Sequence, residues 1–479
     1  MSRRKDQATM KLTRPLLVLT TALLAPAALL GLAPAARAQS LPDALAQAYS
    51  NNPALLAARA NLRAVDENVP QALAGWRPTV SISSSAGILD GSTRARPRGA
   101  AGGIYSDADR QIYSNSITVT QPVFRGGRTV AGTRRAENQV LAQRARLLAT
   151  EQQVMSDTVS AYVSVIRDQE LLRLNINNEQ VLTEQLRATN ERFRVGEITR
   201  TDVAQAESRL AGARANRAQA EGNLQISRST FQRLVGLPPQ NLIAPQPLRL
   251  PVRSAQDAAQ SAALNNPNVV ALLFDEAGAR DNINLQLATL LPQVNVSSQT
   301  FRNDGATTAS TRITGTQLTA SLSVPIYQGG AEYAVVRQAR QSAQQARQLV
   351  DDQRRTVGQS ATQAWEQLQS SKAQVDSVRA QIRAAEIALD GVQREAIVGS
   401  RTTLDVLNAE QELLNARTSL VQALSTVVSQ SYALAATIGR LTASDLGLAV
   451  EPYDMRAYYN EVRNRWVGLG DYSGVAERR

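Results

Sequence analysis

The sequence of 479 residues contains no cysteine and no histidine. Without cysteine the chain has no disulfide bond, and without histidine it has no imidazole for a zinc site or for general acid–base catalysis. An enzyme would have to rely on carboxylates, and no convergent catalytic set of residues appears in the sequence. We therefore predict a protein that is not an enzyme and that uses neither a metal nor a cofactor.

Aromatic residues are scarce, at 4% of the chain, and Lys372 is the only lysine after residue 38. A surface that binds nucleic acid combines clustered cations with aromatic side chains on which bases stack. Here the cations are arginines interspersed with Glu and Asp along predicted helices, which is typical of a solvated helix face. We therefore expect no nucleic-acid partner.

The N-terminus has the features of an export signal. Basic residues precede an apolar stretch at 16–32, and Ala36-Arg37-Ala38 has the small-x-small pattern of a signal-peptidase site. We predict a signal peptide at 1–38, cleaved after Ala38, with Met1 or Met10 as the true start. Without this peptide the chain has 46 basic and 40 acidic residues, so its net charge falls from +11 to +6.

Long apolar runs and proline are missing from most of the remaining chain. No apolar run of 18 residues follows residue 38, so the sequence predicts no transmembrane helix. Proline is absent between Pro122 and Pro238 and between Pro325 and Pro452. Because proline interrupts helices, both intervals can be helical throughout, and both are rich in Ala, Leu, Gln, Arg and Glu, which favour helices.

The second half of the chain repeats the first. Asn51-Asn52-Pro53 recurs 214 residues later as Asn265-Asn266-Pro267, whereas Val195-Gly196 recurs 203 residues later as Val398-Gly399. The difference of 11 residues falls where the first copy carries a Gly/Ser/Arg-rich run at 87–109. Because loops tolerate insertions and packed elements do not, we expect a surface loop in that interval.

Each proline-free region is punctuated once by a Gly hairpin signal, at Val195-Gly196 and at Val398-Gly399, so we predict two antiparallel helix hairpins. Apolar residues recur every seven positions in both hairpins, which predicts left-handed coiled-coil packing. Examples are Leu141, Leu148 and Met155 in the first and Leu368, Val375 and Ile382 in the second.

These patterns divide the chain into five segments. They are the signal peptide (1–38), a first repeat (39–238) with a strand pair at 79–124 and a helix hairpin at 127–236, a linker (239–254), a second repeat (255–441) with a strand pair at 292–325 and a helix hairpin at 329–439, and a C-terminal equatorial segment (442–479).

The predicted strands alternate apolar and small polar residues, as in Thr79-Val80-Ser81-Ile82-Ser83. One apolar and one polar face suit a wall between lipid and water, and they would also suit half of a soluble sandwich. Four strands per chain supply no second sheet, and they cannot close a barrel, whose smallest single-chain form has eight strands. Several chains must therefore pool their strands.

Motifs in a fixed order carry a resemblance to a known family. They are Asn-Asn-Pro at 51 and 265, Gln-Pro-Val-Phe-Arg-Gly-Gly at 121, Val-Pro-Ile-Tyr-Gln-Gly-Gly at 324, Arg-Val-Gly-Glu-Ile-Thr-Arg-Thr-Asp-Val at 194 and Val-Gly-Ser-Arg-Thr-Thr-Leu-Asp-Val at 398. In this order and duplicated, they make the chain resemble the TolC family of outer-membrane efflux and secretion channels.

The resemblance implies a mainly α fold with a small β part. Three chains would form a 12-stranded barrel in the lipid of the cell outer membrane, and their helices would continue it as a long periplasmic α-helical barrel. The implied function is an exit duct that receives cargo from an inner-membrane ABC or RND-type pump through a periplasmic adaptor protein. The cargo would be proteins (type I secretion), small toxic compounds, or both. A secreted coiled-coil scaffold or adhesin is the alternative.

The same resemblance suggests where the duct opens. The periplasmic gate and selectivity positions would be Thr201, Asp202, Arg401, Asp405 and Asn408. In a trimer Asp405 would form an acidic ring that favours cations, with each carboxylate raising the pKa of the others. Asn408 stands where many members have a second Asp, and Ala396 stands where some have a Tyr that takes part in the latch, which together predict a weaker ring and a looser gate. Both aspartates also fit a simpler role at the start of a helix, and we favour that role for Asp202 and the ring for Asp405.

Two further sets of residues complete the predicted sites. The hairpin tips that would dock the adaptor are Val195, Gly196 and Glu197 in the first repeat and Val398, Gly399 and Ser400 in the second. Swivels between strands and long helices are predicted at Pro122, Gly126 and Gly127 and at Pro325, Gly329 and Gly330.

Overall fold

The first half of the chain contains short helices, a strand pair and a long helix hairpin. The computed structural model describes residues 39–95, 98–99 and 104–470, so the predicted signal peptide and its cleavage site lie outside the described residues. The elements in order are α1 (Leu41–Asn51), α2 (Pro53–Asp66), α3 (Asn68–Leu73), the 3-10 turn η1 (Ala74–Trp76), β1 (Thr79–Ala95), β2 (Ile104–Arg125), α4 (Arg128–Arg194) and α5 (Arg200–Val235).

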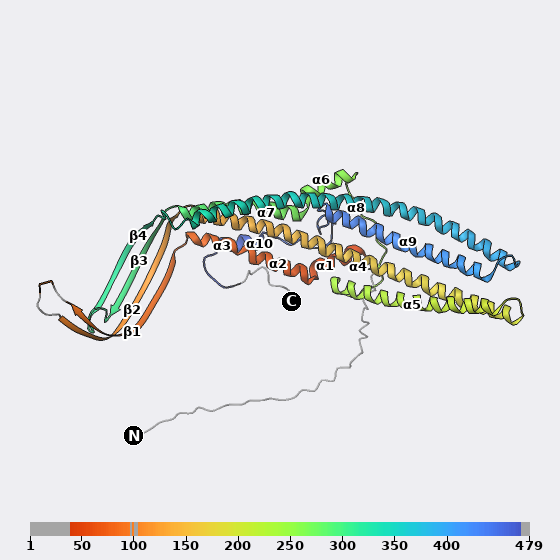
Figure 1. The fold of residues 1–479 in the computed structure, drawn as a ribbon, viewed down its shortest axis with the longest axis horizontal. Coiled ribbons are helices and arrows are strands. Elements are labelled where there is room, and N and C mark those ends of the chain that lie inside the picture. Colours follow the sequence, from red (N-terminus) through yellow and green to blue (C-terminus); the bar gives the residue numbers. More distant parts are fainter. Residues whose placement is uncertain (1–38, 96–97, 100–103, 471–479) are drawn as a thin grey trace, which may run out of the picture. The chain divides into compact units, whose positions relative to one another are not determined.

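The second half repeats this order (Figure 1). Its elements are α6 (Ala255–Asn265), α7 (Pro267–Leu287), the 3-10 turn η2 (Ala288–Leu290), β3 (Gln293–Asp304), β4 (Arg312–Ser323), α8 (Ala331–Ile397) and α9 (Thr403–Thr437), and a short helix α10 (Ala457–Val462) follows. The chain is therefore mainly helical with a small β part, as predicted, and the repeats 39–238 and 255–441 with their linker remain our proposed division. None of the described helices combines the length and apolarity that crossing a membrane requires.

The two Asn-Asn-Pro motifs form equivalent joints. The Asn52 side chain accepts a hydrogen bond from the Ala54 amide (2.9 Å) and so caps α2, while its Nδ2 donates to the Leu234 carbonyl (3.0 Å) at the end of α5. Asn266 repeats both bonds, with the Asn268 amide and the Thr437 carbonyl, each at 3.0 Å. One side chain therefore starts a helix and fastens it to the returning helix of the same repeat.

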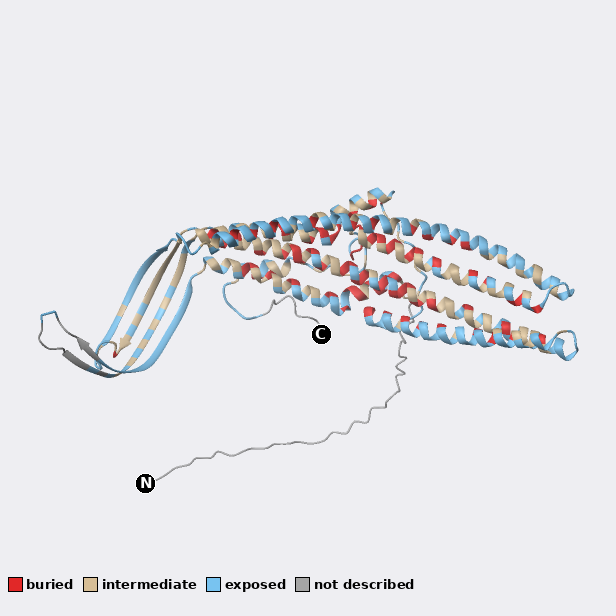
Figure 2. Cartoon of the chain, viewed as in Figure 1, coloured by how far each residue is buried: buried red, intermediate tan, exposed pale blue. Residues whose placement is uncertain are grey.

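Packing between the long helices follows the predicted seven-residue repeat. On α8, buried residues recur at intervals of seven in two rows, Ala343, Val350 and Val357, and Ala361, Leu368 and Val375. The helix α4 packs against α2, α5, α7 and α9 and is buried on several sides, whereas α8 packs against α6, α7 and α9. Much of the outer face of α8 is exposed in the single chain (Figure 2).

The four strands form one antiparallel sheet in the order β1-β2-β3-β4. The expectation of a surface loop at 87–109 is wrong for most of that run, because Gly87 to Ala95 pair with Ile112 to Ile104 and continue the β1–β2 hairpin. Residues 96–97 and 100–103 of the run lie outside the described residues. Strand β3 ends opposite Tyr113, so this part of the hairpin runs on beyond it. The insertion lengthened two strands because each added residue could pair with one across the hairpin.

The two faces of the sheet differ in polarity. Val80, Val119 and Leu318 share one cross-strand row with Ser298, and Ile82 and Ile117 occupy the next row on the same face. On the other face, Ser81, Thr118, Gln299 and Gln317 lie in one row and are small or polar. The predicted alternation is therefore in register between β1 and β2, while Ser298, Thr300 and Thr316 are polar members of the same rows on β3 and β4.

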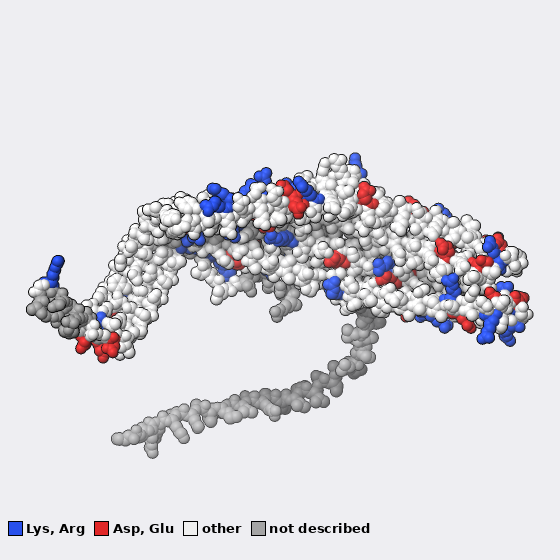
Figure 3. Space-filling view, in the orientation of Figure 1, with Lys and Arg blue, Asp and Glu red and all other residues white. Residues whose placement is uncertain are grey.

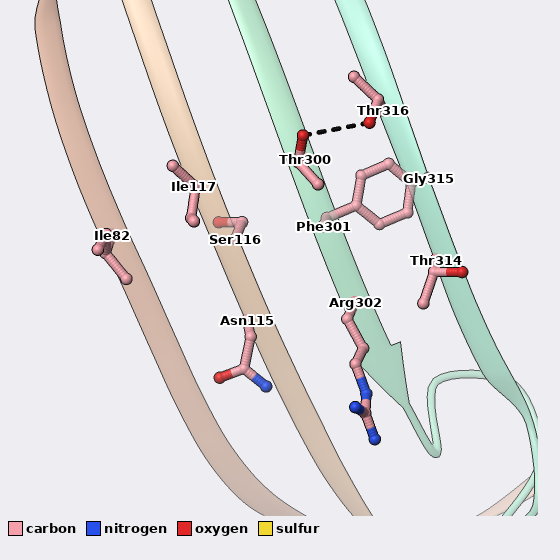
Figure 4. A pocket seen from close by; sticks show the side chains of 10 residues that line it. All are labelled: Ile82, Asn115, Ser116, Ile117, Thr300, Phe301, Arg302, Thr314, Gly315 and Thr316. Atoms are coloured by element: carbon pink, nitrogen blue, oxygen red, sulfur yellow. Dashed lines mark hydrogen bonds between the residues drawn. The ribbon is translucent and has the colours of Figure 1, made fainter.

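A hollow of about 590 Å³ lies along the sheet, lined by residues of all four strands (Figure 4). The ring of Phe301 covers Gly315 on the neighbouring strand, and a Cβ atom at Gly315 would lie 3.1 Å from the ring Cζ. Glycine at this position makes room for the aromatic ring, which in turn shields the backbone of β4.

Candidate gate at the hairpin tips

Both hairpins turn through a glycine that an L-residue would replace only with strain. Gly196 has φ 81° and Gly399 has φ 80°, in the left-handed region that favours glycine. The Gly196 amide donates to the Phe193 carbonyl (3.0 Å), and the Gly399 amide donates to the Ala396 carbonyl (3.2 Å). These bonds close α4 and α8, so the Val-Gly pairs mark the turns as predicted.

The returning helices begin with identical capping boxes. Thr199 Oγ1 accepts from the Asp202 amide (3.3 Å), and the Thr199 amide donates to the Asp202 carboxylate (3.0 Å). Thr402 and Asp405 repeat the arrangement at 3.2 and 3.0 Å. Each pair satisfies amide groups that the first turn of a helix leaves without intrahelical partners.

These bonds act on the acidity of both aspartates. The hydrogen bond from the Thr199 side chain, followed by that from the Thr199 backbone, lowers the pKa of Asp202. The backbone and then the side chain of Thr402 lower the pKa of Asp405 in the same way. Within one chain the shift is opposite to the one expected from an acidic ring, so Asp405 has a demonstrable capping role and the ring remains a prediction.

An ion pair spans each turn, with its polarity reversed between the repeats. Arg192 at the end of α4 pairs with Glu197 (3.1 Å), whereas Glu395 at the end of α8 pairs with Arg401 (2.8 Å). Arg192 and Glu395 occupy equivalent positions, 203 residues apart. The hydrogen bond to Glu395 raises the pKa of Arg401 above its ordinary value. The two tips therefore present different charge patterns on the same backbone.

One hydrogen bond joins the two hairpins to each other. Arg209 on α5 donates from Nη2 to Oδ1 of Asn408 on α9, at 2.9 Å. Next to it, Leu182, Leu210 and Leu407 form a small apolar cluster that spans α4, α5 and α9. The structure thus gives Asn408 a partner, and it adds Arg209, which the sequence analysis missed because no motif contains it.

The remaining tip residues face solvent. Val195 and Val398 are 72% and 79% exposed, and Gly196, Glu197, Gly399, Ser400 and Thr201 are exposed as well. Figure 3 shows side chains of both charge signs gathered at the hairpin ends, whereas the visible face of the strands carries few. Apolar and charged groups are therefore both available for contact at the tips.

The predicted swivels differ between the repeats. Gly127 and Gly330 precede the two long helices, both with φ 82°. Pro122 lies inside β2, where the pairing with β3 shifts between Pro122 and Phe124, whereas Pro325 lies beyond the end of β4. The prediction of both prolines at strand ends is therefore correct only in part, because a bulge lets Pro122 remain within an inner strand.

No cluster of three or more acidic side chains that could hold a metal ion occurs among the residues that the structure describes. The charged groups at the tips are used in caps and ion pairs. The exposed apolar and charged groups around them are suited to contact with another protein chain.

Comparison with known proteins extends over both repeats. The family described as "Outer membrane efflux protein" matches residues 44–237 and 258–440. The outer membrane efflux protein BepC of Brucella suis biovar 1 is 36% identical over 439 residues, covering 91% of this chain and 93% of BepC.

Two further proteins are similar to this chain, one in sequence and one in structure. The alkaline protease secretion protein AprF of Pseudomonas aeruginosa is 25% identical over 330 residues, covering 67% of this chain and 68% of AprF. A crystal structure of CusC has the same fold, with a TM-score of 0.73 at 17% identity, over 84% of this chain and 92% of that one. Because the family match covers both halves, the chain belongs to the outer membrane efflux protein family.

Proposed function

We propose that three copies of this chain form the exit channel of a tripartite export system in the outer membrane. The observation that carries the proposal is the duplicated unit of strand pair and long helix hairpin, which matches the family over both halves. Members of this family are transport channels, so we assign the chain a passage and no catalysis. The comparisons give no support to the alternative of a secreted scaffold or adhesin.

The sheet supports a membrane role for the strands. Strands β1 and β4 each have one neighbour among the described strands, and each therefore has a free edge. The free edges of three copies, paired with one another, would give a closed ring of twelve strands with no edge left unpaired. The apolar rows that contain Val80, Ile82 and Leu318 would then face lipid.

The hairpin tips support a role in docking and gating. Exposed Val195 and Val398 would meet a periplasmic adaptor protein, and an inner-membrane pump of the ABC or RND type would supply the cargo. Asn408 and Arg209 would hold the two hairpins of one chain together in the closed state. Opening would then require this bond and its apolar neighbours to separate.

The relatives support two kinds of cargo. BepC is named for efflux and AprF for secretion of a protease, and the greater identity to BepC favours small toxic compounds as the cargo here. A strain that lacks the gene decides between them. Hypersensitivity to dyes, detergents and antibiotics with unchanged secreted proteins would assign efflux, whereas loss of a secreted protein with unchanged susceptibility would assign type I secretion.

Assembly and processing can be tested on the same protein. A membrane-embedded trimer that resists SDS would support the channel, whereas a soluble monomer in the periplasm or the medium would contradict it. Mass spectrometry of the purified chain would test the proposed cleavage, which leaves Gln39 as the first residue.

A further inference from the structure

The C-terminal segment 453–466 lies along the first repeat and is held by a series of polar contacts. The Tyr453 amide donates to the Tyr49 hydroxyl (2.9 Å), and the Tyr458 hydroxyl donates to Glu67 (2.7 Å). Further along, Arg463 pairs with Glu137, and Arg77 donates to the Arg465 carbonyl and stacks on Trp466. We call 453–466 the strap.

The strap covers a face of alternating charge. Glu137, Arg144 and Glu151 stand seven residues apart on α4, so they lie on one side of that helix. Arg59 and Asp66 stand seven apart on α2. The guanidinium of Arg144 lies 5.1 Å from the ring centre of Tyr459, and that of Arg59 lies 5.2 Å from the ring centre of Tyr453. Tyrosine rings of the strap therefore cover cations of the helices beneath.

Unlike Glu137 and Glu67, which have partners in the strap, Asp66 has no hydrogen-bond partner in the part of the chain that the structure describes. It is only 1% exposed, and neither of its carboxylate oxygens has a hydrogen-bond partner among the described residues. The Nε and Nη2 atoms of Arg144 are buried and lack such partners as well. A buried carboxylate without hydrogen bonds is costly when it is charged, so protonation should favour the state in which it is covered.

We propose that the strap is a pH-sensitive clamp, in which protonation of Asp66 tightens the docking of residues 453–466 onto α2 and α4. The charged groups that act on Asp66 are Arg144 from α4 and Glu67 at the end of α2. Tyr459 of α10 lies over the Arg144 guanidinium and packs against the apolar cluster that contains Val69 of the first repeat, so the strap covers the cation that faces Asp66. No other element needs to move for the clamp to act.

The direction of the effect follows from the proton affinity of Asp66. Burial raises the pKa of Asp66 from 3.8 to about 6, against a lowering by Arg144, and Glu67 adds to the rise. Above this value the docked strap covers a charge, and as the pH falls through about 6 the docked state takes up a proton that the undocked state does not hold. Acidification therefore strengthens docking between pH 7.5 and pH 5, by at most about tenfold, the limit in which undocking returns the pKa of Asp66 to its ordinary 3.8.

Hydrogen exchange measured by mass spectrometry tests the clamp on the purified full-length protein. After correction for the intrinsic pH dependence of exchange, amides in 453–466 should become better protected between pH 7.5 and pH 5, by up to about tenfold. Asp66→Asn, which is neutral at every pH, should show the high protection throughout. Arg144→Gln removes a charge that favours ionised Asp66, so its midpoint should move to higher pH.

Two comparisons keep the test specific. Glu137→Gln removes another carboxylate that contacts the strap and should leave the pH dependence in place. Burial also raises the pKa of Glu151, but this residue contacts the Ala443 amide, so its effect would appear in peptides around 443. Wild-type protection that stays constant or falls with acidification would overturn the clamp, and so would unchanged pH dependence in Asp66→Asn. If Asp66→Asn fails to assemble, the wild-type and Arg144→Gln profiles decide.

Discussion

Asp202 and Asp405 occupy equivalent positions in the first turn of the two returning helices. Each makes the same pair of hydrogen bonds with the threonine three residues before it. The sequence favoured a helix cap for Asp202 and a pore ring for Asp405. A family motif indicates where a residue lies in the fold, but it cannot distinguish between two roles of the same carboxylate. The structure supplies the cap for both. The ring depends on how three copies meet, which no residue of one chain encodes locally.

Two substitutions can separate the effect of the Asp405 charge on the pore from the role of Thr402 and Asp405 as a helix cap. Asp405→Asn should reduce the cation selectivity of the pore, whereas Thr402→Ala should leave selectivity in place and loosen the start of α9. The lowered pKa of Asp405 means that its carboxylate stabilises the tip at pH values above its ordinary 3.8, and that this contribution is lost as the pH falls below that value. Reversal potentials in planar bilayers measure selectivity. Equal selectivity in wild type and Asp405→Asn would mean that Asp405 caps the helix and does not form a selectivity ring.

Glycine at the tips allows a second test at the level of single residues. Gly399 has φ 80° and is exposed, so Gly399→Leu should cost about 1–2 kcal/mol in local strain and place a bulky group where an adaptor would dock. We expect the trimer to form and export to be lost. Gly391→Leu is the control, because no atom lies within 4 Å of a Cβ built there and its φ is not in the left-handed region. Loss of the trimer in Gly399→Leu would point to folding alone.

At the level of elements, the helices were more predictable than the strands. Proline-free intervals and a seven-residue repeat located the helices α4, α5, α8 and α9, because helices are determined by local sequence. The Gly/Ser/Arg-rich run at 87–109 has the composition of a loop, yet most of it pairs across the β1–β2 hairpin. Strand pairing depends on the partner strand, so composition alone could not reveal this extension.

The bond between Arg209 and Asn408 lies between elements that are far apart in the sequence, and for that reason only the structure could reveal it. Arg209→Gln should weaken the contact between the hairpins by about 0.5–1.5 kcal/mol and increase open probability in single-channel recordings. Asn408→Asp should place a carboxylate opposite the guanidinium and reduce open probability. Arg228→Gln, 19 residues further along α5, is the control and should resemble wild type. Identical gating in all four proteins would contradict this role.

At the scale of the whole molecule, the proposed channel requires the sheet to pair with the sheets of other copies. Leu318 is 75% exposed on the apolar face, and Gln317 beside it lies on the opposite face. Leu318→Arg should cost about 2–4 kcal/mol in the membrane and reduce the yield of outer-membrane trimer, whereas Gln317→Arg should be tolerated. Membrane fractionation with SDS gels measures both. Equal yields would mean that this face does not contact lipid.

The prediction that several chains pool their strands rests on four short alternating strands, whereas the number three came from the family resemblance. The alternating pattern of a strand indicates that the free edge of its sheet needs another strand beside it. The pattern does not indicate how many subunits are needed to close a barrel. The joints at Asn52 and Asn266 show the same division. The sequence marked them as equivalent positions of the repeat, and the structure added both the caps that they form and the carbonyl groups that they bind.

The length of the helices that follow Gly127 and Gly330 has a mechanical consequence. Each is a continuous rod of 67 residues, about 100 Å long, that starts at a glycine in the left-handed conformation. Such a rod is a lever, and a rotation of about 2° at its base carries its far end through about 3.5 Å. Arg209 and Asn408 lie on the returning helices α5 and α9, which pack against these rods. A tilt of one rod relative to the other would lengthen their 2.9 Å contact beyond hydrogen-bond distance, so a slight tilt beside the sheet is enough to part the hairpins near their tips.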